Sequence, residues 1–177
     1  MSGRWEKYNR RLEKEFEPLK RVMTMTIYGS YYPQSEKDFL ISQRDFLRDK
    51  GYENTNIVDD YPDPEPDITS LEKSIRCLEF SDVNFLVFTR EGKRYGVSRE
   101  LTHIATSSRM IDKIPFCTVF EQVRDERDSI PPLSLDDINN SGINRREFET
   151  EQQLQTALSQ QSFAKLRRLQ NTLIKRL

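Results

Sequence analysis

The stretch VNFLVFTREGKRYGVSRELTHIATSS, residues 83–108, contains the clearest strand, loop and helix signals in the chain. Residues 83–88 are an almost continuous apolar run, which is typical of a strand covered on both faces. Residues 89–96 are polar and contain two glycines, as expected of a loop. Apolar residues then recur at three- and four-residue steps, so residues 97–108 are predicted to form an amphipathic helix.

Strand and helix signals continue to alternate on both sides of this unit. Further strands are predicted at 23–28, 56–59 and 114–120, with helices between Ser35 and Gly51 and between Thr69 and Ser81. Such alternation favours a parallel sheet with right-handed crossovers. The predicted fold class is therefore α/β: a doubly wound (flavodoxin/Rossmann-like) parallel sheet of about 4–5 strands, with amphipathic helices appended at both termini.

The same patterns divide the chain into four segments. Residues 1–22 are predicted to form an N-terminal amphipathic helix, and residues 23–120 an α/β domain of the nucleotide-binding type. Residues 121–143 are polar and lack a strong periodicity, so they are interpreted as a linker. Residues 144–177 carry leucines at three- and four-residue steps, which predicts a C-terminal amphipathic helix.

The composition narrows the class of protein. The chain has 28 Lys and Arg against 29 Asp and Glu, a net charge of −1, so binding to nucleic acid in general by charge alone is not indicated. No apolar run of about 18 residues occurs, and the N-terminus lacks the run that a signal peptide needs, so a cytoplasmic protein without a membrane association is expected. Cys77 and Cys117 lack the spacing of a zinc site and are expected to be buried free thiols.

Open parallel sheets bind ligands outside the carboxyl ends of the strands, where the strand order reverses. Here this rule selects residues 29–33 and 89–100, which follow the first and third predicted strands. Gly29 permits a close backbone approach, Ser30 offers a hydroxyl and Tyr31 a stacking face for a base, ribose or phosphate. A plain turn between strand and helix is the alternative interpretation.

Glu100 is the strongest candidate for chemistry. It is expected in the first turn of the helix that begins near Gly96, off the apolar stripe and facing the cleft. A helix cap or a partner of the helix dipole is the alternative, because acidic residues are common in first turns.

Several short motifs between residues 27 and 101 together resemble the nucleoside 2-deoxyribosyltransferase superfamily. They are Ile27-Tyr-Gly-Ser30, Asp60, Phe80-Ser-Asp-Val83, Glu91-Gly92 and Gly96-Val-Ser-Arg-Glu-Leu101. Members of that family use a carboxylate, placed after a glycine at the start of this helix, to attack the anomeric carbon and release the base. The resemblance implies that Glu100 is the nucleophile or the group that stabilises an oxocarbenium centre. It also implies that Tyr28 orients Glu100, and that Asp60 or Glu91 protonates or holds the base.

The turn at Gly29-Ser30 and the nearby basic residues also resemble the nucleotide branch of this family, the 2′-deoxynucleoside 5′-phosphate N-hydrolases. In this comparison Arg90, Lys93, Arg94 and Arg99 surround a phosphate, together with the helix start at Gly96 and Ser98. A solvated rim explains the basic residues equally well.

Two departures from the family bear on the reaction. Thr102 and Ile104 stand where the family has small residues, and the asparagine that transferases lend across their subunit interface has no clear match. The departures favour hydrolysis over transfer. TIR-like domains, which cleave the nicotinamide–ribose bond of NAD⁺ with a glutamate carried on a helix, are a more distant resemblance.

The sequence thus predicts a hydrolase or transferase that cleaves the N-glycosidic bond of a nucleoside, nucleotide or NAD-like substrate. No cofactor or metal is expected. NAD⁺, if the protein acts on it, would be a substrate rather than a cofactor. The alternatives are a non-catalytic nucleotide-sensing module that signals through its terminal helices, and a scaffold that those helices assemble. A homodimer is expected because related enzymes complete their clefts with a neighbouring subunit. It would also cover the leucine stripe of Leu166, Leu169, Leu173 and Leu177. The alternative is that the N-terminal stripe of Trp5, Tyr8, Leu12 and Leu19 covers those leucines within one chain.

Overall fold

The computed structural model describes residues 14–63, 68–93, 95–106, 117–123, 130 and 132–174. A helix over residues 14–22 leads into the sheet. The elements that follow are β1 (Met25–Tyr28), α2 (Gln34–Asp49), β2 (Thr55–Ile57), the 3₁₀ turn η1 (Val58–Asp60), α3 (Ser70–Phe80), β3 (Val83–Phe88), α4 (Tyr95–Thr106), β4 (Cys117–Gln122), α6 (Pro132–Ser141), β5 (Asn144–Phe148) and α7 (Glu151–Ile174).

The five strands form one parallel sheet in the order β2-β1-β3-β4-β5. Ile27 in β1 is paired with Ile57 on one side and with Phe85 on the other. The chain therefore turns back between β1 and β3, which is the flavodoxin-like order. The predicted fold class is confirmed.

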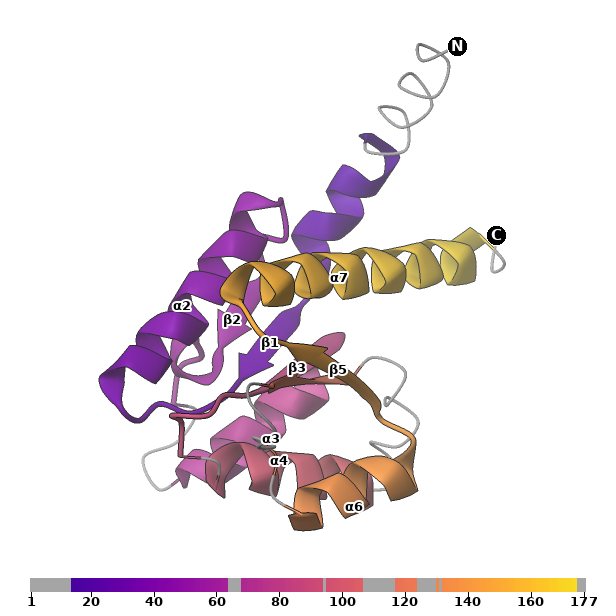
Figure 1. The fold of residues 1–177 in the computed structure, drawn as a ribbon. Coiled ribbons are helices and arrows are strands. Elements are labelled where there is room, and N and C mark those ends of the chain that lie inside the picture. The colour runs from indigo at the N-terminus through magenta and orange to yellow at the C-terminus, as the bar shows by residue number, and fades with distance from the viewer. Residues whose placement is uncertain are drawn as a thin grey trace.

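Each face of the sheet carries its own apolar cluster, and helices cover both faces (Figure 1). α2 and α7 cover one face, with Leu40 and Leu158 in the cluster. α3, α4 and α6 cover the other, where Leu101 is fully buried. All six residues of β3 are buried, which explains the continuous apolar run in the sequence.

The helix starts agree with the sequence in one case and differ in another. Thr69 caps α3, and its side chain and that of Glu72 form a reciprocal capping box. The helix that the sequence predicts from Ser35 begins one residue earlier, directly after Pro33, and no side chain caps it. Cys77 and Cys117 are buried and free, as predicted.

The predicted linker at 121–143 is wrong, because β4 runs to Gln122 and α6 packs against α4. The predicted C-terminal helix at 144–177 is also wrong at its start, since residues 144–148 form the edge strand β5. β5 has the sequence NRREF, which lacks the apolar alternation by which a strand is predicted. Arg145 forms an ion pair with Glu121, which is fully buried in β4. A charged residue of β5 thus compensates a buried charge on the neighbouring strand.

The described part of the leucine stripe is covered by the sheet of its own chain. Leu166 is fully buried in the cluster that contains Phe85, and Leu169 packs against that cluster. Earlier on the same helix, Leu154 and Leu158 are fully buried in it too. The side chain of Leu173, and Leu177, lie outside the described residues. The stripe therefore gives no support to the homodimer, which stays a prediction.

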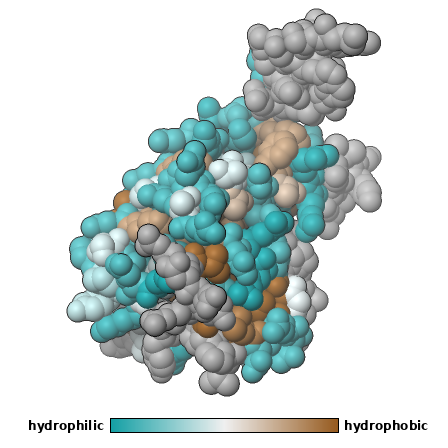
Figure 2. Space-filling model, viewed as in Figure 1, coloured by the Kyte–Doolittle hydropathy of each residue, from teal (hydrophilic) through white to brown (hydrophobic). Residues whose placement is uncertain are grey.

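The face of the molecule seen in Figure 2 is mostly hydrophilic, with apolar patches confined to small areas, in keeping with the mixed charges of the sequence. Within the described ranges, every helix is too short or too polar to span a membrane.

Candidate functional site

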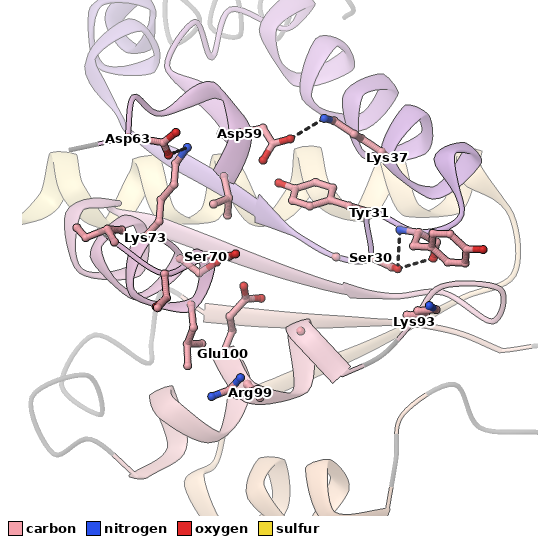
Figure 3. Close-up of a pocket in the computed structure, with 18 residues that line it drawn as sticks. Ser30, Tyr31, Lys37, Asp59, Asp63, Ser70, Lys73, Lys93, Arg99 and Glu100 are labelled. Atoms are coloured by element: carbon pink, nitrogen blue, oxygen red, sulfur yellow. Dashed lines mark hydrogen bonds and ion pairs between the residues drawn. The ribbon is translucent and has the colours of Figure 1, made fainter. Parts of the chain in front are cut away.

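A cleft of about 1010 Å³ opens at the carboxyl ends of β1 and β3, the edge that the sequence predicted (Figure 3). The turn after β1 and the loop after β3 form one wall, and the starts of α3 and α4 form another. The lining residues are Gly29, Ser30, Tyr31, Tyr32, Lys37, Val58, Asp59, Asp63, Ile68, Thr69, Ser70, Leu71, Lys73, Ser74, Lys93, Gly96, Arg99 and Glu100.

Gly29 is required by packing. A Cβ atom there would lie 2.7 Å from Cδ2 of Leu40 and 3.2 Å from the carbonyl oxygen of Val87. Leu40 is buried in the core and cannot move aside. Gly29 thus lets α2 approach the sheet, which supports the interpretation of a turn between strand and helix for this residue.

Gly92 brings the loop after β3 against the turn after β1. A Cβ atom on Gly92 would lie 2.6 Å from Cβ of Ser30, 2.7 Å from Oγ1 of Thr89 and 3.0 Å from Oε2 of Glu36. Thr89 donates a hydrogen bond to the buried Glu36 carboxylate at the same place. The loop after β3 is therefore held against the turn after β1 by close packing and against the start of α2 by a buried polar contact.

Ser30 builds the turn rather than offering a free hydroxyl. Its Oγ donates to the carbonyl oxygen of Tyr32 at 2.7 Å and accepts from the Tyr32 amide at 3.1 Å. The Lys93 amide donates to the same carbonyl at 3.1 Å, and Nζ of Lys93 lies 4.1 Å from the centre of the Tyr32 ring. An aromatic ring and an amine therefore lie together in the lining of the cleft.

Glu100 points into the cleft from α4 (Figure 3). α4 begins at Tyr95, so Glu100 lies in the second turn, and the first turn contains no acidic residue. The prediction that Glu100 lies in the first turn is wrong. The alternative that Glu100 is a helix cap or a partner of the helix dipole is wrong for the same reason.

The Glu100 carboxyl is deeply buried. The residue is 7% exposed, and its Oε2 has no hydrogen-bond partner among the residues that the structure describes. Burial raises the pKa of Glu100 to about 7, because a carboxylate loses its hydration inside the protein. The interaction with the Ser74 side chain opposes this rise. The carboxyl can therefore gain or lose a proton near neutral pH.

Three titratable neighbours surround this carboxyl. Burial raises the pKa of Tyr28 and of Tyr31, and raises that of Cys77 to about 11, with a smaller contribution from the negative charge of Glu100 in each case. Tyr28 is fully buried and does not line the cleft. Its hydroxyl has no hydrogen-bond partner in the described part of the chain, so the predicted hydrogen bond to Glu100 is not formed.

Two ion pairs at the rim of the cleft were not predicted from the sequence. Lys37 on α2 lies 2.5 Å from Asp59, and its amine is 5.5 Å from the centre of the Tyr31 ring. Lys73 on α3 lies 2.9 Å from Asp63 (Figure 3). These residues come from segments that only the tertiary fold brings together.

The structure places Asp60 away from the cleft. One carboxylate oxygen accepts from Arg44 at 2.6 Å, and the other accepts from the Ile57 amide at 2.9 Å. The prediction that Asp60 lines the site is wrong, and the adjacent Asp59 lines it instead. The 3₁₀ turn η1, which the sequence predicted as part of a strand, determines which of the two acids faces the cleft.

Four other predicted residues do not line the cleft or cannot be placed. Glu91 is exposed outside it, and the Arg90 amide donates to the side chain of Gln122 in β4 at 3.2 Å. Ser98 is partly buried on α4 and is also absent from the lining. Arg94 lies outside the described residues. The predicted residues that do line the cleft are Gly29, Ser30, Tyr31, Lys93, Gly96, Arg99 and Glu100.

A comparison of the sequence with protein-family models and with curated proteins finds no match. The class of protein is therefore described from its fold and its cleft alone. The chain is a doubly wound α/β protein with a buried carboxyl group in the cleft at the reversal point of its sheet.

Proposed function

We propose that the chain is an enzyme that cleaves the N-glycosidic bond of a nucleoside, nucleotide or NAD-like substrate, with Glu100 as the catalytic residue. The observation that carries the proposal is the Glu100 carboxyl, which lines the cleft, is almost fully buried and has one oxygen without a partner among the described residues. A buried carboxyl of this kind is costly to the fold, and such groups concentrate at functional sites.

The proposed reaction uses the ionised form of Glu100. A carboxylate oxygen forms a bond to the anomeric carbon as the bond between that carbon and the base nitrogen breaks, and the base leaves with the electron pair. Neither Asp60 nor Glu91 lines the cleft, so neither is the acid that the resemblance implied. In the proposed reaction the base takes its proton from water. Water then hydrolyses the glycosyl ester and restores the carboxylate. If no covalent ester forms, the same anion stabilises the oxocarbenium centre while water attacks.

The rest of the cleft supports a nucleotide as the substrate. The starts of α3 and α4 both border it, and the dipoles of the two helices favour a negatively charged group. Lys37 and Lys73 are paired with Asp59 and Asp63, whereas Lys93 adds positive charge at the mouth of the cleft. Tyr31 and Tyr32 offer aromatic rings. As further parts of this proposal, the enzyme acts in the cytoplasm and forms a homodimer.

A substrate panel tests the proposed function. The purified chain is incubated with nucleosides, 2′-deoxynucleosides, their 5′-monophosphates and NAD⁺, and free base or nicotinamide is measured by chromatography. Release from a member of the panel supports the proposal. Binding of a panel member without release supports the nucleotide-sensing module instead, and neither binding nor release contradicts both.

The pH dependence of base release should identify the form of Glu100 that reacts. Because its pKa is raised to about 7, the carboxyl is mostly protonated at pH 6 and mostly ionised at pH 8. A reacting anion therefore gives a kcat/KM that rises about tenfold between these pH values. Steady-state kinetics across this range provide the measurement. A kcat/KM that falls between pH 6 and pH 8 would instead assign Glu100 the role of a general acid.

Gly96 should control access to Glu100. It lies four residues before Glu100 on α4 and lines the cleft, and a Cβ atom there would meet nothing within 4 Å. Packing does not require this glycine, so Gly96→Leu should fold with a stability within about 1 kcal/mol of the wild type. The new side chain should fill space that the substrate needs and lower kcat/KM at least about tenfold.

The comparison variant is Gly96→Ala, whose smaller side chain should have the smaller effect. Urea denaturation and steady-state kinetics measure the two properties separately. Unchanged kinetics for Gly96→Leu would show that the substrate does not approach along the start of α4.

A further inference from the structure

A separate cavity of about 310 Å³ opens at the other edge of the sheet, at the amino ends of β3, β4 and β5. It is bordered by the first residues of these strands and by α7, which packs on β3 and β5. The described residues that line it are all different from those that line the cleft at Glu100. Its volume lies at the lower end of the range of small-molecule sites in proteins.

Two basic side chains of α7, Lys165 and Arg168, line this cavity. They are three residues apart on a helix, so they are neighbours on the same side of it. Lys165 is only 6% exposed, which is rare for a lysine, whereas Arg168 is exposed. Like charges at this spacing repel each other, and the burial of one of them costs further free energy. An anion in the cavity would compensate both charges.

The rest of the lining is neutral and contains hydrogen-bonding groups. Thr118 of β4 and Asn144 of β5 are paired in register at the starts of their strands, and both line the cavity. Hydroxyl and amide groups of this kind can donate to an anion. No described residue of the lining is acidic. The carboxyl end of α6, next to Gly142, disfavours an anion, but a helix end carries only about half a charge, against the two full charges of the basic residues.

We propose that this cavity is a binding site for a small molecule with a phosphate group, held by Lys165 and Arg168. A phosphate monoester carries close to two negative charges near neutral pH, which matches the two cations. Its terminal oxygens can accept hydrogen bonds from a guanidinium and an ammonium group at the same time. The cavity shares no lining residue with the cleft, so the inference does not depend on the proposed function.

The charge of Lys165 depends on its surroundings. Burial lowers its pKa to about 7, the negative charge of Asp82 opposes this fall, and the positive charge of Arg168 adds to it. Asp82 does not line the cavity, and its Oδ2 accepts from the amide of Thr24 at 2.9 Å and from its hydroxyl at 2.8 Å. The thiol of Cys117, which does line the cavity, is neutral because burial raises its pKa to about 12. An anion should therefore bind best below pH 7, where Lys165 is charged.

Sulfate is the probe that tests the inference, because it is a dianion with the shape of phosphate and does not titrate between pH 6 and pH 8. Its binding is followed by NMR through the backbone amide signals of Thr118 and Asn144, at constant ionic strength with chloride as the reference salt. At pH 6 sulfate should shift these signals in a saturable way. Lys165→Met and Arg168→Gln should each weaken the binding at least about tenfold, since each removes a charged hydrogen-bond donor.

Arg167→Gln is the matched control. Arg167 is the exposed neighbour of Arg168 on the same helix, but it does not line the cavity. The control changes the net charge by the same amount, so a general attraction of sulfate to the helix would weaken equally in both arginine variants. Its affinity for sulfate should change less than about twofold. Arg168 is exposed, so Arg168→Gln should fold and carries the test even if Lys165→Met does not.

The pH dependence and a second probe complete the test. The affinity of the wild type for sulfate should fall about tenfold from pH 6 to pH 8, as Lys165 loses its proton. Arg168→Gln should keep this fall and Lys165→Met should abolish it. Acetate, which has a single charge, should bind at least about tenfold more weakly than sulfate. The inference is overturned if sulfate gives no saturable shift, if Arg167→Gln loses as much affinity as Arg168→Gln, or if acetate binds as tightly as sulfate.

Discussion

Replacing Glu100 with glutamine is expected to lower the rate of base release at least about a hundredfold, because the anion is removed while the shape of the side chain is kept. The measurement is the rate of base release from the best substrate of the panel, at saturating concentration. Glu91→Gln is the control, since Glu91 is exposed outside the cleft and should keep nearly all of its activity. Near-normal turnover of Glu100→Gln would remove Glu100 from the mechanism.

The same variant should have a characteristic effect on stability. The pKa of Glu100 is raised to about 7 in the folded chain from the ordinary value of 4.5, so the folded state holds the proton more tightly than the unfolded state does. The resulting stabilisation is present below pH 4.5 and is lost as the pH rises towards 7 and above. Between pH 5 and pH 8 the wild type should therefore lose about 2–3 kcal/mol relative to Glu100→Gln.

Urea denaturation of both proteins at the two pH values measures this difference, and the titration of other groups cancels. A difference that does not change with pH would show that the carboxyl is not buried in the way that the structure describes. A difference that changes as expected would show that the ionised Glu100 carboxyl lowers the free energy of unfolding. A buried group that destabilises the fold in this way is typical of a functional site.

Leu158→Ala should lower the free energy of unfolding by a large amount. Leu158 is fully buried between α7 and the sheet, so removal of its side chain should cost about 2–5 kcal/mol. Gln160→Ala, at an exposed position on the same helix, should change stability by less than about 0.5 kcal/mol. Urea denaturation followed by circular dichroism measures both.

This experiment also tests whether α7 belongs to the domain. A Leu158→Ala variant that keeps its free energy of unfolding but changes from dimer to monomer in light scattering would place the α7 leucines at a subunit interface. The structure leads us to expect a destabilised chain with an unchanged oligomeric state.

The sequence was sufficient for the features that depend on local patterns. The apolar run at 83–88 and the helical spacing after residue 97 correspond to β3 and α4, and together with the pattern around Gly29 they locate the reversal point of the sheet. The cleft and the presence of Glu100 in it then follow from a general rule about parallel sheets. These parts of the site could be predicted because they require no knowledge of distant contacts.

The remaining parts depend on tertiary structure. η1 turns Asp59 towards the cleft and Asp60 towards Arg44, and the sequence does not distinguish two adjacent aspartates. Lys73 and Ser74 reach the site because α3 packs against α4. β5 was not predicted because its charged residues break the apolar alternation, and one of them, Arg145, is paired with the buried Glu121 of β4.

The most direct test of the central claim is a crystal structure of the Glu100→Gln variant soaked with a 2′-deoxynucleoside 5′-monophosphate. We predict that the ligand occupies the cleft with its anomeric carbon within about 3.5 Å of the side chain at position 100, which is the distance of a reacting pair. Its phosphate should lie near the starts of α3 and α4. A ligand that turns its phosphate towards position 100, or that binds outside the cleft, would contradict the claim that Glu100 acts on the glycosidic bond.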